Sequence, residues 1–257
     1  MPEIIKDYDK NIIRIKKGDR ALIFGQSRLS DGNMSFARGG KAEVIENRRG
    51  FFRRYDLELD NLAAAGLAHG NRIEEVSDEY RGCGAFGLED AIPDVDGLVS
   101  DRPGLILAVT TADCLPVFAY DNNLTTAGIA HAGWKGAAAG IQSRLIESMM
   151  KFSGSKARDI HVHIGAGIKP CCYDVDNSRI EMFPPAHLDS IFIHRNGKLY
   201  LDLCSAVSLS LIEKGLPQSN ITISGECSFC GGKYPSFRRM GAEFITDIAF
   251  ITIQDNY

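Results

Sequence analysis

Several features that would place the chain in a membrane or nucleic-acid class are missing from its 257 residues. No stretch has the roughly 20 consecutive apolar residues needed to cross a bilayer. Charges interrupt the N-terminal sequence MPEIIKDYDKNIIRI every few residues, so it lacks the apolar core of a signal peptide. The net charge is small, at -4, and no block of Lys and Arg could follow a phosphate backbone. We therefore expect a cytoplasmic protein that binds neither membranes nor nucleic acid.

The cysteines do not form the dense pattern of a small disulfide-rich protein. There are seven, an odd number, scattered along a long chain, which favours reduced thiols, one or more of them with a chemical role. Neither an internal repeat nor a linker rich in Pro, Gly and Ser divides the sequence. Hydrophobic residues make up 44% of the chain, which is enough for a sizeable core. We expect one domain that spans residues 1–257.

What the chain does contain is a mixture of helix and strand patterns. Apolar residues recur at helical spacing from about Lys41 to Tyr55 and again over residues 136–151, where Gly154 is placed to end the helix. A strand that runs into a helix ending at Gly215 is predicted later in the chain. Short apolar runs predict further strands at residues 104–109, 115–120, 125–132, 159–168, 220–227 and 242–254. Because strands and helices do not alternate strictly, we predict an α+β fold.

Three residues stand out as candidate metal ligands. His69, Cys114 and His131 each lie at the expected end of an element, where side chains can converge on a pocket. Imidazole and thiolate are preferred ligands of Zn²⁺, and three protein ligands leave a fourth position open, as in catalytic zinc sites. The spacing alone matches no compact metal motif. The same residues are also compatible with a Cys114 nucleophile and a histidine base.

The segments around these residues resemble the laccase-domain family, whose members are described as polyphenol oxidases and as purine nucleoside phosphorylases of the YfiH and YlmD type. The resemblance rests on DGNMSF (31–36), ENRR (46–49), TTADCLPV (110–117), AHAGWKGAAAGI (130–141), IGAGIKPCCYDV (164–175), LYLDL (199–203) and PSFRR (235–239). It implies mixed sheets between helices, similar to a toxin-deamidase fold. It also implies a metal, zinc or alternatively copper, held by His69, Cys114 and His131. The chain departs from the family pattern in the residues before His69 and in Cys230.

Five further residues are candidates for substrate binding or catalysis. Lys135 precedes the helix predicted over residues 136–151, so it could balance the charge of a phosphate at that helix N-terminus. Arg238 could add an arginine fork for phosphate, and the resemblance adds Arg48 to this anion site. The resemblance also implies that Asn33 binds substrate. Asp113 adjoins the metal cysteine and could orient a ligand or transfer a proton.

The remaining cysteines are interpreted as structural. Cys171 and Cys172 are neighbours in the chain, and we expect them to be packing residues near the pocket. Cys227 and Cys230 have a spacing seen in redox sites and half zinc sites, but the sequence indicates no second pair to complete a zinc site. We therefore expect no metal at this pair.

Two further pairs have a functional and an ordinary interpretation. Asp94 and Asp96 could share a face and do acid–base work, or could simply belong to a loop. His161 and His163 have the spacing of metal ligands on one strand face, but a strand facing solvent explains them as well.

The resemblance implies phosphorolysis of purine nucleosides such as adenosine, inosine and guanosine. The partners would be nucleosides and phosphate, and the protein a monomer or a homodimer. Adenosine deamination and methylthioadenosine phosphorolysis are further implied activities, although the common H-x-E and P-C-x-x-C deaminase signature is absent. A copper-dependent polyphenol oxidoreductase is an alternative, but six histidines are too few for a four-copper laccase centre. An amidase with Cys114 as nucleophile, acting on cell-wall precursors, is the other alternative.

Overall fold

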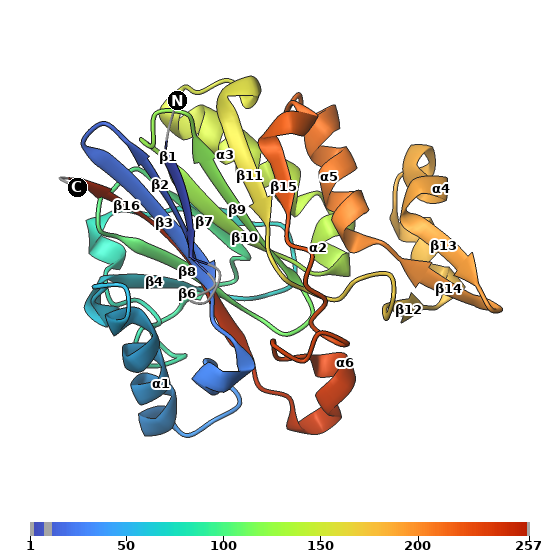
Figure 1. Cartoon of the computed structure of the whole chain (residues 1–257), viewed down its shortest axis with the longest axis horizontal. Coiled ribbons are helices and arrows are strands. Elements are labelled where there is room, and N and C mark those ends of the chain that lie inside the picture. The colour runs from blue at the N-terminus through green and yellow to red at the C-terminus, as the bar shows by residue number, and fades with distance from the viewer. Residues whose placement is uncertain (1–2, 8–11, 256–257) are drawn as a thin grey trace.

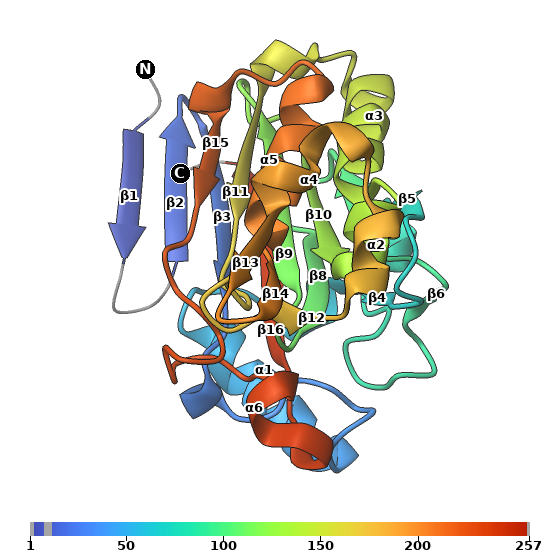
Figure 2. The same ribbon diagram turned by 90° about the vertical axis from the view of Figure 1, so that its right-hand side faces the viewer.

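The chain folds into two β-sheets that pack face to face, with helices on both outer sides (Figure 1). A computed structural model describes residues 3–7 and 12–255. Figure 2 shows the two sheets and the small third sheet from the side. Within the described residues, no helix is long and apolar enough to span a membrane. The mixed sheets with helices on either side confirm the predicted α+β class.

The larger sheet has seven strands and is covered on its outer face by α1 (Lys41–Arg53), at the position where a helix is predicted. Phe51 and Phe52 of α1 pack edge-on against Phe250 of the sheet, with ring centroids 5.7 and 5.2 Å from it. The strands, in spatial order, are β1 (Glu3–Asp7), β2 (Ile12–Lys17), β3 (Arg20–Gln26), β16 (Asp247–Asp255), β8 (Ile106–Thr111), β4 (Leu62–Gly66) and β6 (Ile92–Pro93).

The second sheet has six strands, and α2 (Trp134–Ala138), α3 (Ile141–Ser153) and α5 (Leu203–Glu213) lie on its outer side. Its strands, in spatial order, are β15 (Ile221–Ile223), β11 (Ile160–Ile164), β9 (Leu115–Asp121), β10 (Ala127–Ala132), β7 (Gly97–Ser100) and β5 (Ile73–Glu75). Its central strands are buried on both faces, which explains why they are continuous apolar runs in the sequence.

A core of apolar side chains fills the space between the two sheets. Phe24 and Leu107 of the larger sheet and Phe118 and Ile129 of the smaller sheet belong to one buried cluster. The rings of Phe24 and Phe118 lie 5.1 Å apart. This closely packed core fixes the two sheets relative to each other, and with them the strand ends from which the loops begin.

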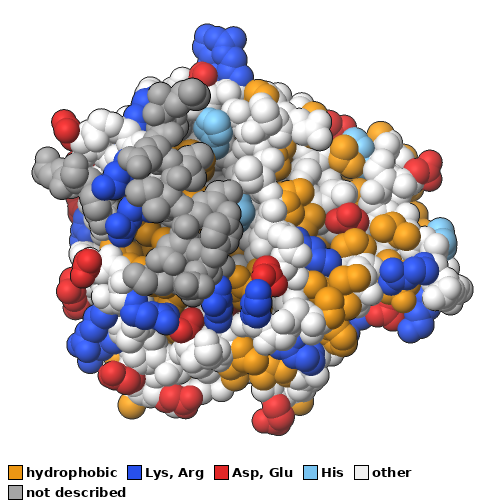
Figure 3. All heavy atoms as spheres, viewed as in Figure 1, with side chains coloured by type: hydrophobic (Ala, Val, Ile, Leu, Met, Phe, Trp, Pro, Cys, Tyr) orange, Lys and Arg blue, Asp and Glu red, His pale blue; other side chains and the backbone are white. Residues whose placement is uncertain are grey.

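Smaller elements surround the sheets. A third sheet contains β12 (Asp174–Val175), β14 (Lys198–Leu201) and β13 (Phe192–Arg195), next to α4 (Leu188–Ile191). The short helix α6 (Phe237–Met240) precedes the last strand. On the face shown in Figure 3, hydrophobic side chains gather over α6 and the neighbouring three-stranded sheet, among lysines and arginines. Short 3₁₀ turns lie at Leu29–Asp31, Leu59–Asn61, Asp78–Tyr80, Ala157–Asp159, Asn177–Met182, Pro185–His187, Gln218–Asn220 and Gly241–Glu243.

One predicted helix is wrong in its extent. The single helix expected over residues 136–151 is divided into α2 and α3, and the helical conformation begins earlier, at Trp134. Gly140 lies between the two helices with a φ of 79°, a left-handed conformation that interrupts the helix. Gly154 ends α3 with a φ of 71°, as predicted.

Candidate metal centre and substrate pocket

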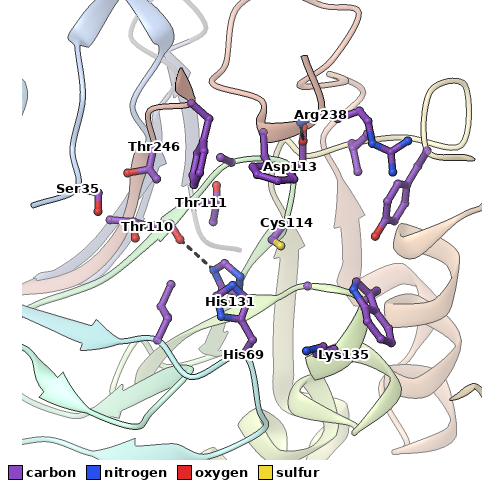
Figure 4. Close-up of a pocket in the computed structure, with 18 of the residues that line it drawn as sticks. Ser35, His69, Thr110, Thr111, Asp113, Cys114, His131, Lys135, Arg238 and Thr246 are labelled. Carbon is purple, nitrogen blue, oxygen red and sulfur yellow. Dashed lines mark hydrogen bonds between the residues drawn. The ribbon is translucent and has the colours of Figure 1, made fainter. Parts of the chain in front are cut away.

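A cavity of about 850 Å³ opens where loops from both sheets meet, and His69, Cys114 and His131 lie together on its wall (Figure 4). Its lining residues come from almost the whole length of the chain, from Ser35 to Thr246. A cavity of this size accommodates a molecule as large as a nucleoside.

The pairing of β9 with β10 explains why Cys114 and His131 are neighbours. The two strands are antiparallel, and Ala132 at the end of β10 faces Leu115 at the start of β9. Cys114 immediately precedes Leu115 and His131 immediately precedes Ala132, so both side chains lie at the same end of this strand pair. The register of this antiparallel strand pair therefore brings together two residues that are 17 positions apart in the sequence.

The ring of His131 has one nitrogen paired and one directed into the site. Its Nδ1 lies 2.9 Å from the carbonyl oxygen of Thr110, and a carbonyl can only accept, so Nδ1 carries the proton. Its Nε2 is buried and has no hydrogen-bond partner among the described residues. Burial, followed by the nearby His69, lowers the pKa of His131 to about 4. A neutral imidazole with a bare, buried Nε2 has the donor that a metal ion requires.

His69 is held in an unusual backbone conformation by a buried carboxylate. Its φ is 60°, which non-glycine residues adopt rarely. The two carboxylate oxygens of Asp96 accept the N–H groups of His69 and Gly70, each at 2.7 Å. The backbone oxygen of Asp96 accepts the N–H of His131, also at 2.7 Å. Asp96 thus positions both histidines, whose ring centroids lie 5.1 Å apart.

The Cys114 thiol lies in a confined and negatively charged environment. A Cβ placed on Gly133 would lie 2.9 Å from the Cys114 Sγ and 3.7 Å from the His131 Nε2, so only glycine leaves this space open. Burial, with the carboxylates of Asp113, Asp247 and Asp96, raises the pKa of Cys114 to about 12. These carboxylates disfavour an isolated thiolate but attract a cation, and a bound cation stabilises the thiolate. The donor set therefore fits a metal ion.

A second group of cysteines is arranged more tightly than this trio. Among the residues that the structure describes, one group of His, Cys, Asp or Glu side chains has all its ligand atoms within 4.8 Å of one another, and it consists of Cys171, Cys172, Cys227 and Cys230. The expectation that Cys227 and Cys230 have no second cysteine pair beside them is therefore wrong. Cys171 is also exposed rather than packed in the core.

Lys135, Asp113 and Arg238 line the cavity, as expected from the sequence. Lys135 is exposed in the first turn of α2, but that helix has only five residues, so the dipole of a long helix does not support an anion there. The Asp113 carboxylate accepts the Ser228 hydroxyl at 2.6 Å and the N–H of Arg238 at 2.7 Å. The guanidinium of Arg238 is bonded to Asp174, with Nη1 2.5 Å from its Oδ1.

Asn33 and Arg48 do not line the cavity, in contrast to their expected roles. The Arg48 guanidinium is buried and donates to the backbone oxygens of Met34 and Gly84 at 2.6 Å. The Asn33 side chain accepts the N–H groups of Ser35 at 3.1 Å and Thr246 at 3.2 Å. Because Ser35 and Thr246 line the cavity, these hydrogen bonds of Asn33 hold part of the cavity wall in position. Arg48 similarly holds together the backbone behind it.

Two other pairs, Asp94 with Asp96 and His161 with His163, have a functional and an ordinary interpretation, and their surroundings decide between the two. Asp94 is exposed while Asp96 is 1% exposed, so they do not form an acid–base pair. The His161 ring stacks on Tyr120 at 5.3 Å. The His163 Nδ1 lies 2.9 Å from the Thr222 hydroxyl. Neither histidine belongs to the cavity lining, which supports the ordinary interpretation.

Several lining residues were not singled out in the sequence. The aromatic rings of Trp134, Tyr173, Phe237 and Phe244 and the guanidinium of Arg179 belong to the wall. Arg179 lies 3.5 Å from the centroid of the Trp134 ring. Trp134, Tyr173 and Phe237 occur within the segments HAGWKG, CCYDV and PSFRR, so those segments carried a signal for them. Phe244 and Arg179 have no such signal.

Hydroxyl groups complete one side of the cavity. Ser35, Thr110, Thr111 and Thr246 lie together on one side of the cysteine and histidines in Figure 4 and belong to the lining residues. They offer both donors and acceptors to a polar ligand.

The fold and the site together define the class of this protein: an α+β protein with two packed mixed sheets and a His, Cys and His group in a cavity between their loops. The family model described as multi-copper polyphenol oxidoreductase laccase matches residues 19–254, and the chain belongs to this family.

Relatives and solved structures agree with this placement. The chain is 34% identical over 194 residues to purine nucleoside phosphorylase YlmD of Geobacillus stearothermophilus, covering 74% of this chain and 71% of the relative. It is 29% identical to adenosine deaminase RL5 of an unknown prokaryotic organism, covering 86% and 87%. The structure of YlmD from Geobacillus stearothermophilus superposes with a TM-score of 0.87 at 28% identity, covering 99% of this chain and 100% of that chain. Bacillus licheniformis hypothetical protein YfiH gives a TM-score of 0.86 at 30% identity, covering 97% and 98%.

Proposed function

We propose that the protein is a metal-dependent purine nucleoside phosphorylase that acts in the cytoplasm as one domain. The observation that carries the proposal is the buried, unpartnered Nε2 of His131 beside the Cys114 thiol, within a cavity large enough for a nucleoside. We propose His69, Cys114 and His131 as the ligands of Zn²⁺, with copper as the alternative ion. When bound, the metal supplies Lewis-acid stabilisation of an oxygen on phosphate or substrate.

The side chains around the cavity suit both phosphate and the purine base of a nucleoside. In phosphorolysis a phosphate oxygen bonds to the ribose C1′ and the bond from C1′ to the purine nitrogen breaks. The base leaves with that electron pair and gains a proton, which balances the proton that hydrogen phosphate loses on becoming an ester. Lys135, Arg179 and Arg238 line the cavity and would attract phosphate. The rings of Phe237 and Phe244, 5.0 Å apart and at 86° to each other, would contact the purine base, one with its face and the other with its edge.

Adenosine deamination is a second candidate, because the relative named adenosine deaminase RL5 covers more of the chain than YlmD does. The two reactions use the same nucleoside but differ in their second substrate. Phosphorolysis of adenosine requires phosphate and releases adenine, while deamination requires water and releases inosine.

The other two candidates have less support. Only two of the six histidines, His69 and His131, line the cavity, which is too few for a multi-copper oxidase centre. For a cysteine nucleophile, the raised pKa of Cys114 and the lowered pKa of His131 oppose transfer of the thiol proton to the imidazole. The lowered pKa of His131 keeps its imidazole neutral, as a metal ligand must be, and a bound cation would offset the raised pKa of Cys114 by stabilising its thiolate.

The test is product analysis on purified protein with its metal content measured. Adenosine and inosine are each incubated with and without phosphate, and bases and nucleosides are separated by chromatography. We expect adenine and hypoxanthine only when phosphate is present. Cys114→Ala should lose metal from this site and lower base release by at least about 100-fold, whereas Cys83→Ser, a cysteine outside the cavity, should not. Full phosphorolysis by Cys114→Ala without metal at this site would refute the catalytic role of the metal, and inosine formation from adenosine without phosphate would favour deamination.

A further inference from the structure

The four-cysteine cluster is assembled by two neighbouring parallel strands. β11 and β15 pair in parallel, with Val162 opposite Ile221, so the loops that follow them leave the sheet at the same edge. An isolated parallel bridge between Gly167 and Cys227 continues this pairing beyond the strands. Cysteines about 56 positions apart in the sequence therefore meet at one place because of the sheet topology.

The distances between the sulfur atoms suit a tetrahedral metal ion. All four Sγ atoms lie within 4.8 Å of one another, and the Sγ atoms of Cys171 and Cys230 are 3.7 Å apart. With Zn–S bonds of about 2.3 Å, the edge of a tetrahedral four-sulfur site is roughly 3.8 Å. All seven cysteines of the chain are free thiols in the structure. We propose that Cys171, Cys172, Cys227 and Cys230 bind a structural Zn²⁺ ion, separate from the metal of the cavity.

Backbone hydrogen bonds hold the loop that contains Cys227 in place. The N–H of Ser228 donates to the backbone oxygen of Gly167 at 3.1 Å and joins this loop to the segment that leads to Cys171. The N–H of Gly231 donates to the Cys227 oxygen at 2.9 Å and closes the turn.

A single arginine fixes the shape of this loop. The Arg239 guanidinium donates to the backbone oxygens of Phe229 and Tyr234, each at 2.6 Å, and also to that of Ser228. The loop is thus held in place by hydrogen bonds within the chain, so little rearrangement is needed when the ion binds.

The cluster adjoins the cavity but does not line it. Cys171 and Cys172 directly precede Tyr173 and Asp174, which form part of the cavity wall. On the other loop, Ser228 donates to Asp113, the residue before the cavity cysteine, at 2.6 Å. Four protein ligands leave no open position for substrate, as in structural zinc sites. The proposed ion therefore ties together the two loops that support one wall of the cavity.

The experiment uses the full chain with Cys114→Ala, so that the cavity metal is absent, and measures zinc per chain by elemental analysis and native mass spectrometry under reducing conditions. We expect about one zinc per chain in this background. It should be lost when Cys230→Ser is added and kept when Cys83→Ser is added instead. A folded Cys114→Ala protein with reduced thiols and no zinc, or retention of zinc after Cys230→Ser, would overturn the proposal. Because activity is not the readout, this result is independent of the proposed phosphorylase.

A second measurement applies if the Cys230→Ser variant does not fold. The unmodified protein is alkylated, and the labelled cysteines are identified by peptide mass mapping. Cys171 and Cys230 are exposed, but we expect a bound ion to protect both from alkylation until a zinc chelator is added. Equal labelling with and without chelator, or a disulfide between these two cysteines under native conditions, would contradict a zinc site.

Discussion

The carboxylate of Asp96 accepts the backbone N–H of His69 at 2.7 Å and holds that residue at a φ of 60°. Because the backbone oxygen of Asp96 also accepts the N–H of His131, one residue sets the positions of both proposed histidine ligands. Asp96→Asn keeps the size of the side chain but turns an accepting oxygen into a donor that faces an N–H group. We expect a roughly 10- to 100-fold loss of metal affinity in the cavity, measured by competition with a chelator.

The neighbouring acid provides the control for this prediction. Asp94 lies two residues earlier and is exposed, so Asp94→Asn should leave the metal affinity unchanged. Circular dichroism should show that both variants are folded. Equal affinities in the two variants would mean that Asp96 does not position the ligands.

Gly133 gives a steric test of the site. Its backbone, with a φ of -77°, suits any residue, so Gly133→Ala adds no backbone strain. The new Cβ would lie 2.9 Å from the Cys114 Sγ, which is closer than side chains tolerate, and the thiol must move. We expect the cavity metal to bind at least about 10-fold more weakly while the fold is kept.

Gly50→Ala is the matched control, since a Cβ at that position in α1 meets nothing within 4 Å. It should bind metal as the unchanged protein does, and a helical Gly→Ala exchange should slightly raise the stability. Unchanged metal binding in Gly133→Ala would show that Cys114 is not confined as the structure indicates.

Substitution of Arg48 tests whether this residue holds the backbone in position or binds substrate. Burial lowers the pKa of its guanidinium to about 10, so it is still charged at neutral pH, and it donates only to backbone oxygens among the described residues. Arg48→Ala would leave those buried oxygens without donors, and we expect a loss of roughly 2–4 kcal/mol in the free energy of unfolding. The KM for phosphate should stay within about twofold. Arg49→Ala, on the exposed side of α1, is the control for stability. A large rise in the KM for phosphate in Arg48→Ala, with unchanged stability, would instead mean that Arg48 binds phosphate.

The contrast between Cys114 and Asp96 shows how far the sequence predicts the site. Cys114 and His131 lie in motifs next to apolar strands, so strand ends and register could be anticipated for them. Asp96 contacts His69 from 27 positions away, and nothing in its local pattern distinguishes it from Asp94. The difference between them is burial, which depends on the packing of the two sheets.

The cysteine cluster and the divided helix have a similar explanation. The pairing of β11 with β15 joins distant segments, so the sequence shows Cys227 and Cys230 but not the partners that complete the group. Gly140 lies within a run whose apolar spacing is helical on both sides. Periodicity therefore predicted the helical segments, while the left-handed glycine that divides them was not recognised.

Asp247 is expected to make the stability of the protein depend on pH. It is buried and accepts the Thr111 hydroxyl at 2.6 Å and the Gln26 amide at 2.9 Å. Burial raises its pKa from 3.8 to about 7, so the folded state binds this proton more tightly than the unfolded state does. The resulting stabilisation is complete below pH 3.8 and is lost as the pH rises through about 7. This shift corresponds to a change of about 4 kcal/mol at most.

Asp247→Asn removes the titration while an amide can still bond to Thr111 and Gln26. Unfolding by denaturant is measured for both proteins between about pH 4 and pH 8 with a chelator present, so that metal release does not contribute. The unchanged protein should lose stability relative to Asp247→Asn as the pH rises, because only its carboxyl group must ionise in a buried position. Parallel pH profiles of the two proteins would show that Asp247 ionises equally well in the folded and unfolded states, and that burial does not raise its pKa.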